Sequence, residues 1–171
     1  MDNLYTTYTL EEIKLFQKLS TKKENITATS KILSLSKKIS IFKEIPENVL
    51  VKILKDIKIV KYNKNEIIIK EGDSDTTIFY ILLGSVKVIK QNQIITKLSR
   101  NSIIGEMAGL LNQKRTASIK ANEDNTTIIS FKIDFDLIQT NLGYYFALIY
   151  KNLSTELAKK IVYQNNQIIN K

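Results

Sequence analysis

The sequence of 171 residues contains no cysteine and no histidine. Without cysteine the chain has no disulfide framework and no thiolate chemistry, and without histidine it has no imidazole base and no histidine-ligated metal. Most hydrolytic and redox mechanisms are therefore excluded. Glycine occurs 5 times and proline once, so the chain is not a flexible low-complexity polymer. Its 43% hydrophobic content is enough for one core of ordinary size.

Arginine is also scarce: Arg100 and Arg115 are the only arginines among the 26 basic residues. The formal charge of +9 is spread along the whole chain, and no segment is a basic arm. A lysine-rich solvated surface is therefore favoured over a dedicated face for nucleic acid or anionic membrane. Because the arginine fork recognises phosphate bidentately and lysine does not, each arginine is a candidate phosphate ligand.

Long apolar runs are missing as well. The first twenty residues include Asp2, Glu11 and Glu12, which do not suit a signal peptide. The longest apolar stretches, such as Ile78 to Leu83, are too short to cross a bilayer. We therefore expect a cytoplasmic protein with no membrane partner.

The hydrophobic periodicity changes twice along the chain. Helical spacing predicts short helices over 10–19, 32–39 and 47–55, the third started by Pro46. Short runs rich in isoleucine and valine then alternate with turn residues, which predicts seven strands. They lie at 57–62, 67–70, 78–83, 86–89, 94–98, 116–121 and 126–131. The helical period returns in a short helix at Leu137 and Ile138 and in a long final helix from Phe146 to Ile168.

These patterns predict a mainly β fold with flanking helices: an antiparallel β-barrel or jelly roll (double-stranded β-helix) between N-terminal helices and a long C-terminal helix. The predicted organisation is a helical segment at 1–38, the barrel at 39–135 and the final helices at 136–171. The apolar stripe of the last helix packs on the barrel or on the same helix of a second copy, so a homodimer through this helix is one expected partner.

The segment from Leu98 to Thr116 is long for a turn inside a compact barrel, and long ordered loops are commonly functional. A short helix is predicted from Glu106 to Leu111, directly after Gly105. Arg115 follows where the next strand begins. One carboxylate and one guanidinium beside a helix N-terminus suit a ligand that carries both a phosphate and a hydroxyl.

This segment resembles the phosphate-binding cassette of the cyclic nucleotide-binding domain family, at 104–118. The family pattern is Gly-Glu-x-Ala, a short helix, then Arg-x-Ala-Ser/Thr. It is matched here by Gly105-Glu106-Met107-Ala108 and Arg115-Thr116-Ala117-Ser118. The hairpin Lys70-Glu71-Gly72-Asp73 and the run 80–88 are also similar to the family, and the resemblance extends from about Ile39 to the C-terminus. Asn101 departs from a frequent glycine, and Gly109 departs from an apolar residue of the cassette helix.

The resemblance implies a role for each matched residue. Arg115 would pair with the exocyclic oxygens of the cyclic phosphate, and Glu106 would accept a hydrogen bond from the ribose 2′-hydroxyl. Gly105 and Ala108 would offer backbone N–H groups and room. The predicted binding set is completed by the remaining matched positions, which are Met107, Thr116, Ala117 and Ser118. Ala117 would keep the floor of the pocket small. The hydroxyl of Ser118 would lie near the phosphate or near a guanine edge.

In the family the last helix covers the base. By resemblance to the catabolite activator, Gln164 and Asn165 occupy the places of the residues that contact the base. A polar helix end that faces water is the alternative interpretation of these two residues.

The implied function is a sensor module that binds a cyclic mononucleotide, cyclic AMP before cyclic GMP, and signals by repositioning its last helix. We expect no enzyme activity, no metal and no cofactor, because the sequence offers no convincing nucleophile or base. The alternative is a structural or dimerisation module with a degenerate pocket or another ligand such as cyclic di-GMP. A cupin-type enzyme is excluded because its metal site depends on histidine. The chain ends at Lys171, so we expect no DNA-binding domain, and a protein effector is the other expected partner.

Overall fold

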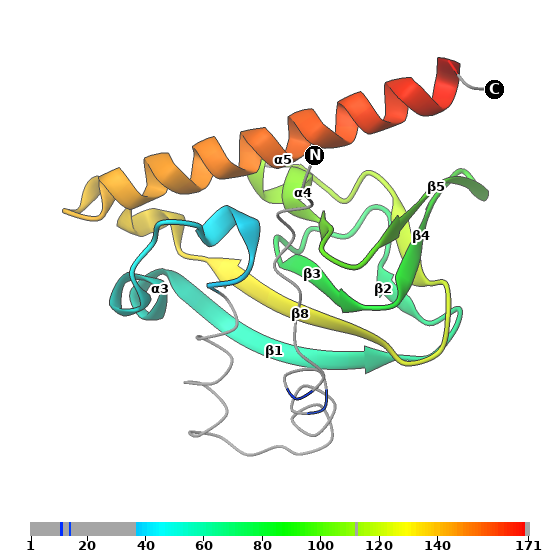
Figure 1. Cartoon of the computed structure of the whole chain (residues 1–171), viewed down its shortest axis with the longest axis horizontal. Helices are drawn as coiled ribbons and strands as arrows, with labels where there is room; N and C mark the ends of the chain where they lie inside the picture. The colour runs from blue at the N-terminus through cyan, green and yellow to red at the C-terminus, as the bar shows by residue number, and fades with distance from the viewer. Residues whose placement is uncertain (1–10, 12–13, 15–36, 112, 170–171) are drawn as a thin grey trace. The chain divides into compact units, whose positions relative to one another are not determined.

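The computed structural model describes residues 11, 14, 37–111 and 113–169 (Figure 1). They belong to two compact units: the first contains Lys55–Ile133, and the second contains 37–54 and the chain from Asp134 onward. The predicted helices at 10–19 and 32–39 lie almost wholly outside the described residues, although Glu11 and Lys14 are helical. The predicted boundaries 1–38, 39–135 and 136–171 stay a prediction.

Eight strands form two antiparallel four-stranded sheets (Figure 1). One sheet has the order β1-β8-β3-β6, made of Leu54–Tyr62, Thr126–Ile133, Ile78–Leu83 and Ile103–Ile104. The other has the order β2-β7-β4-β5, made of Ile67–Ile69, Ser118–Ala121, Ser85–Lys90 and Gln93–Ser99. Most neighbours in each sheet are distant in sequence, as in a jelly roll. The predicted fold class is confirmed.

All seven predicted strands are present, with ends shifted by up to three residues. The eighth, β6, was not predicted from the sequence. It has only two residues, Ile103 and Ile104, which pair with Tyr80 and Phe79 of β3. Two residues are too few to show a period of two, so only the pairing with β3 defines this strand.

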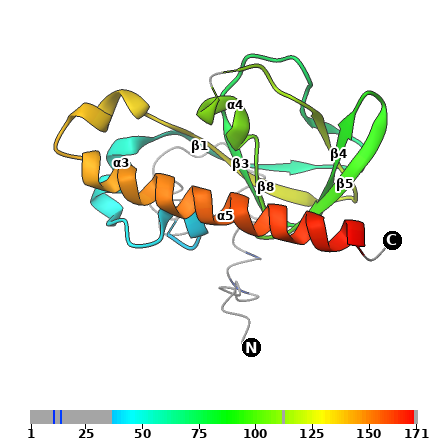
Figure 2. The same ribbon diagram turned by 90° about the horizontal axis from the view of Figure 1, so that it is seen from above.

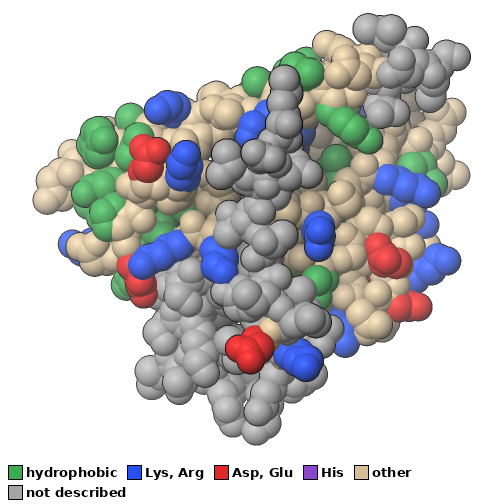
Figure 3. Space-filling model, viewed as in Figure 1, with side chains coloured by type: hydrophobic (Ala, Val, Ile, Leu, Met, Phe, Trp, Pro, Cys, Tyr) green, Lys and Arg blue, Asp and Glu red, His purple; other side chains and the backbone are tan. Residues whose placement is uncertain are grey.

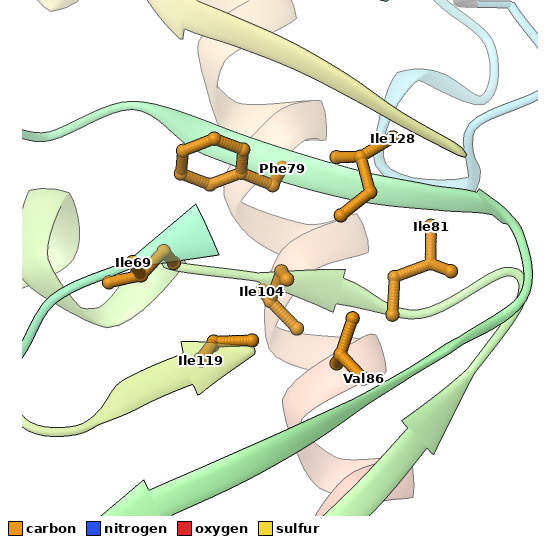
Figure 4. Close-up of a cluster of buried hydrophobic side chains, with 7 residues drawn as sticks. All are labelled: Ile69, Phe79, Ile81, Val86, Ile104, Ile119 and Ile128. Carbon is orange, nitrogen blue, oxygen red and sulfur yellow. The ribbon is translucent and has the colours of Figure 1, made fainter. Parts of the chain in front are cut away.

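The core of the first unit lies between the two sheets (Figure 4). Its buried side chains are Phe79, Ile81, Ile104 and Ile128 from one sheet and Ile69, Val86 and Ile119 from the other. Strands β3 and β8 are buried along almost their whole length, on both faces. This burial explains why they appear in the sequence as nearly continuous apolar runs rather than as an alternating pattern.

Several tight turns have asparagine or glutamine at positive φ, in addition to the turns at Gly72, Gly84 and Gly105. Non-glycine residues adopt positive φ at several turns, among them Asn65, Gln91, Asn92, Asn101 and Asn125. Gln91 and Asn92 join β4 to β5, and positive φ at both central residues is the geometry that matches the twist of a two-residue hairpin. Figure 2 shows this hairpin in the first unit. Asn101 has φ 68°, so it does take the conformation expected from its place at a frequent glycine position.

The second unit is helical. Helix α3 (Glu47–Ile53) follows Pro46, as predicted, and ends where β1 begins. The short 3-10 helices η1 (Ser40–Phe42) and η2 (Phe135–Gln139) both contact the long helix α5 (Gly143–Ile169). The side chain of Asn152 in α5 donates hydrogen bonds to Ile41 O at 3.2 Å and Lys43 O at 3.0 Å. The rings of Phe135 and Phe146 also pack, with centroids 6.0 Å apart.

The surface agrees with the composition. On the face drawn in Figure 3, lysine and arginine side chains stand among acidic, apolar and neutral ones rather than in one basic region. Within the described part of the chain, every helix is too short or too polar to span a membrane.

Candidate functional site

The predicted cassette forms a compact corner of the first unit. Strand β6 ends at Ile104, Gly105 turns the chain with φ +81°, and helix α4 (Glu106–Leu110) follows at once. An added Cβ at Gly105 would lie 2.7 Å from Nη1 of Arg115 and 3.0 Å from Thr77 O. Both the positive φ and the close approach require glycine, so this residue fixes the entry to α4 and makes room for the guanidinium.

Arg115 is the central residue of this corner. Its side chain is 3% exposed. Nη1 donates to Gly105 O at 2.5 Å, and Nη2 donates to Thr77 O at 2.6 Å and to Asp75 Oδ2 at 3.1 Å. The guanidinium carbon lies 5.7 Å from the centre of the Phe79 ring, within reach of a cation–π contact. The fold therefore buries the side chain of Arg115 and fixes the direction of its guanidinium.

The backbone of Arg115 is held as firmly as its side chain. Its N–H donates to Asp73 O at 2.8 Å, and its carbonyl accepts from Gly72 N–H at 2.9 Å. The hairpin predicted at 70–73 is thus a structural part of the site. Because backbone and side chain are both tied to the segment before β3, Arg115 is preorganised before any ligand arrives.

Asp75, Thr77 and Phe79 contact Arg115, and the sequence analysis did not identify them. Asp75 carries the charge that faces Arg115. Partial burial raises the pKa of the Asp75 carboxyl, but hydrogen bonds from Thr77 and from the Arg115 guanidinium lower it, and the net pKa lies below the ordinary value. The only signal in the sequence is position, since these residues follow the matched hairpin glycine. Nothing in the spacing shows that Asp75 contacts a residue 40 positions later or that Thr77 contacts the same residue 38 positions later.

The first half of the motif splits into buried and exposed residues. Glu106 is 4% exposed and Ala108 is 3% exposed, whereas Met107 is 44% exposed. The carboxylate of Glu106 lies in the first turn of α4, where negative charge is favourable. Met107 is largely exposed, in contrast to its two neighbours in the motif.

The second half of the motif leads into β7. Thr116 is exposed, and Ala117 and Ser118 are half-buried. The Ser118 hydroxyl oxygen accepts a hydrogen bond from Glu71 N–H at 3.0 Å. This bond gives Ser118 a structural role in joining the hairpin to β7, and its hydroxyl hydrogen can still be donated.

Gln164 and Asn165 lie in α5, in the second unit, and both are exposed. Their predicted contact with the base stays a prediction. The apolar stripe of α5 is buried at Phe146 and Leu153, but Ile161 is 57% exposed. The stripe is therefore buried only in the first half of the helix.

The corner formed by Gly105, Glu106 and Arg115 contains one guanidinium and one carboxylate. Arginine has five N–H donors, and the contacts above use three of them. Among the described residues nothing accepts from Nε–H or from the second Nη1–H of Arg115. The same part of the chain contains no cluster of acidic residues that could hold a metal ion. A guanidinium and a carboxylate in one place suit an anion that also carries a hydroxyl group.

Comparison with known proteins agrees with this geometry. Residues 59–135 match the model of the cyclic nucleotide-binding domain. They contain both halves of the motif and every residue that contacts Arg115. These residues belong to the cyclic nucleotide-binding domain family.

Relatives of this domain include a protein kinase and a transcriptional regulator. A cGMP-dependent protein kinase of Toxoplasma gondii is 37% identical over 86 residues, which are 50% of this chain and 9% of the kinase. The cAMP-activated global transcriptional regulator CRP of Pasteurella multocida (strain Pm70) is 33% identical over 118 residues, which are 64% of this chain and 54% of the regulator. The chain therefore spans a small part of the kinase and about half of the regulator.

Solved cyclic nucleotide-binding domains share the fold. A domain from Methylobacillus flagellatus kt superposes with a TM-score of 0.63 at 20% identity, covering 99% of this chain and 95% of that one. The structure of cAMP-bound PfPKA-R (141-441) superposes with a TM-score of 0.52 at 26% identity, covering 89% of this chain and 49% of that one. The predicted family is confirmed by the domain match over residues 59–135, and the roles of individual residues remain predictions.

Proposed function

We propose that the cyclic nucleotide-binding domain of this chain binds a cyclic purine mononucleotide and performs no reaction on it. The observation that carries the proposal is the buried guanidinium of Arg115, of which Nε–H and one Nη1–H have no acceptor among the described residues. A cyclic phosphate carries one negative charge, which the positive guanidinium can balance, and its exocyclic oxygens can accept from the Nε–H of Arg115. Glu106 supplies an acceptor for the ribose 2′-hydroxyl in the same corner.

Two nucleotides are candidates. The motif resemblance favours cyclic AMP, and the cAMP-bound PfPKA-R structure supports it at 26% identity. The kinase relative at 37% identity is cGMP-dependent, which supports cyclic GMP. The hydroxyls of Thr116 and Ser118 are compatible with either purine, because a hydroxyl both donates and accepts.

Calorimetric titration of the purified chain with both nucleotides tests the proposal. We expect saturable binding that Arg115→Ala abolishes, because charge-assisted hydrogen bonds contribute about 1.5–3 kcal/mol each. Even one such bond corresponds to a loss on the order of 10-fold to 100-fold. Arg100→Ala is the matched control, since Arg100 is the other arginine and is exposed. Arg115→Lys keeps the charge without the fork and should bind with intermediate affinity.

The two binding curves rank the nucleotides. If neither nucleotide gives heat with folded protein, the sensor proposal is wrong. Cyclic di-GMP is then the third titrant, because binding of that ligand would support the alternative in which the pocket takes a different nucleotide.

We further propose that occupancy is signalled by a change in the position of α5, as a population shift. Ligand contacts that exist only in one arrangement favour that arrangement by their differential free energy. Hydrogen exchange of the α5 amides with and without saturating nucleotide tests this part. Identical exchange in both states would contradict the signalling role while leaving the binding role intact.

A dimer through α5 is a second candidate function, and the exposed apolar residues of this helix favour it. Ile161, Val162 and Tyr163 are 57%, 59% and 57% exposed. Exposed apolar side chains grouped on one helix commonly mark a contact with another chain. Sedimentation equilibrium of the wild type and of Val162→Glu decides it: a dimer that the charge disrupts supports the proposal, and a monomeric wild type contradicts it.

A further inference from the structure

Asp75 contacts two cations at once, one through each carboxylate oxygen. Oδ2 lies 3.1 Å from Nη2 of Arg115, and Oδ1 lies 3.5 Å from Nζ of Lys132. The same Lys132 nitrogen lies 4.0 Å from Oδ2 of Asp56. All of these residues belong to the first unit. A negative charge therefore stands permanently beside the group that has to bind a negative ligand.

Arg115 does not need Asp75 to keep its position. The carbonyl oxygens of Gly105 and Thr77 accept at 2.5 and 2.6 Å, shorter than the 3.1 Å bond to Asp75. The backbone of Arg115 is tied on both sides, and the Phe79 ring lies against the guanidinium. Neutral carbonyls fix the direction of the guanidinium without neutralising it. The main effect of Asp75 on Arg115 is therefore its charge.

A phosphate bound to the remaining donors of Arg115 would lie within a few ångströms of the Asp75 carboxylate. Like charges at such distances repel strongly where water is partly excluded. Asp75 is 46% exposed, so solvent weakens the repulsion without removing it. Lys132 balances part of the same charge from the other side, at 43% exposure.

We propose that Asp75 sets the affinity of the site as an internal competitor of the phosphate for Arg115, and that Lys132 limits this competition by pairing with the other oxygen of Asp75. The inference rests on the proposed function, since it assumes a phosphate-bearing ligand at Arg115. It makes the unusual prediction that removing an ion-pair partner of the central arginine improves binding.

The test variant is Asp75→Asn. Asparagine keeps one acceptor oxygen for Thr77 N–H, and its amide can donate to the Thr77 hydroxyl, so the turn around 75–77 is preserved. We expect cyclic nucleotide to bind about tenfold more tightly, because one like charge is removed beside the phosphate. Thermal stability should fall slightly, because an ion pair is lost. A merely structural role of Asp75 would lower affinity and stability together.

Lys132→Gln tests the second half of the proposal in a double-mutant cycle. In the wild-type background we expect binding about threefold weaker, because the charge of Asp75 is less balanced. In the Asp75→Asn background the same change should have no effect. Lys120→Gln, which removes a lysine of β7 with no Asp75 contact, is the matched control and should act equally in both backgrounds.

Inorganic phosphate is the second probe, followed through the Arg115 Nε–Hε resonance in NMR titrations of the full chain. Asp75→Asn should strengthen this weak binding by a similar factor. If the variant does not tighten the binding of either phosphate or nucleotide, or if phosphate leaves the resonance unchanged in both proteins, the inference is wrong. If phosphate binds more tightly to the variant while both nucleotides fail to bind, the inference holds and the proposed function is wrong.

Discussion

Gly105 lies in direct contact with the guanidinium of Arg115. The Gly105 carbonyl accepts from Nη1 of Arg115 at 2.5 Å, and a Cβ on Gly105 would lie 2.7 Å from the same nitrogen. The residue that turns the chain into α4 therefore also accepts from the guanidinium, and it can do both only without a side chain. The glycine at one end of the cassette motif is therefore needed to accommodate the arginine at the other end.

Gly105→Ala should reduce both affinity and stability. The new methyl group would displace Arg115 or Thr77 O, and alanine at φ +81° is strained by about 1–2 kcal/mol. We expect nucleotide affinity to fall at least tenfold and the midpoint of thermal unfolding to drop. Calorimetric titration and differential scanning calorimetry measure the two effects.

Gly72→Ala is the matched control for that change. Gly72 has φ +87°, but a Cβ there would meet nothing within 4 Å. It should show the backbone strain without displacing Arg115, so stability falls and affinity changes little. Equal losses of affinity in the two variants would show that the steric argument for Gly105 is wrong.

Gly109→Ala should stabilise the site. Gly109 lies within α4, and a Cβ there would meet only Thr76 O at 3.8 Å and Thr76 Cβ at 3.9 Å, ordinary contact distances. Alanine is favoured over glycine inside a helix by about 0.8–1 kcal/mol. We expect a raised midpoint of denaturant unfolding and a few-fold gain in nucleotide affinity. A loss of stability would mean that α4 needs the freedom of glycine.

Asp75 should contribute to the loss of stability in acid. Its pKa in the folded domain lies below the ordinary value, so the unfolded chain takes up the proton first as the pH falls. The contribution of Asp75 is thus present at neutral pH and is lost as the pH falls below about 4 toward the lowered pKa. Asp75→Asn should be slightly less stable than wild type at pH 7 and should lose less on acidification. Denaturant unfolding at pH 7 and pH 3 measures the difference, and parallel losses in both proteins would contradict the lowered pKa.

Asn152→Ala should loosen the second unit. It removes both donors to Ile41 O and Lys43 O, leaving two carbonyls of the η1 segment without these partners. Such a loss typically costs about 1–3 kcal/mol, and less where water can replace the donor. Hydrogen exchange should accelerate at Phe42 N–H and Ile45 N–H, which form the local turns. Ser154→Ala, on the exposed side of the same helix, is the control and should leave these amides unchanged.

The sequence predicted most of the fold because local patterns encode it. Long apolar runs such as β3 and β8 and the periodic α5 are visible without any tertiary information. Strand β6 is not, because two residues have no period. The end of α3 was also placed too late, at residue 55, because Leu54 begins β1 and apolar character alone does not separate a helix end from a strand start.

The candidate site, like the fold, could be predicted only in part from the sequence. The motif residues, Gly105 among them, and the scarcity of arginine that makes Arg115 a candidate are visible in the sequence alone. Only the tertiary structure decided what Arg115 meets: it lies 40 residues from Asp75 and 38 from Thr77, and such contacts follow from strand order rather than from spacing. Local propensities act over a few residues, whereas the charge balance of a buried guanidinium is set by whichever strands the fold brings beside it.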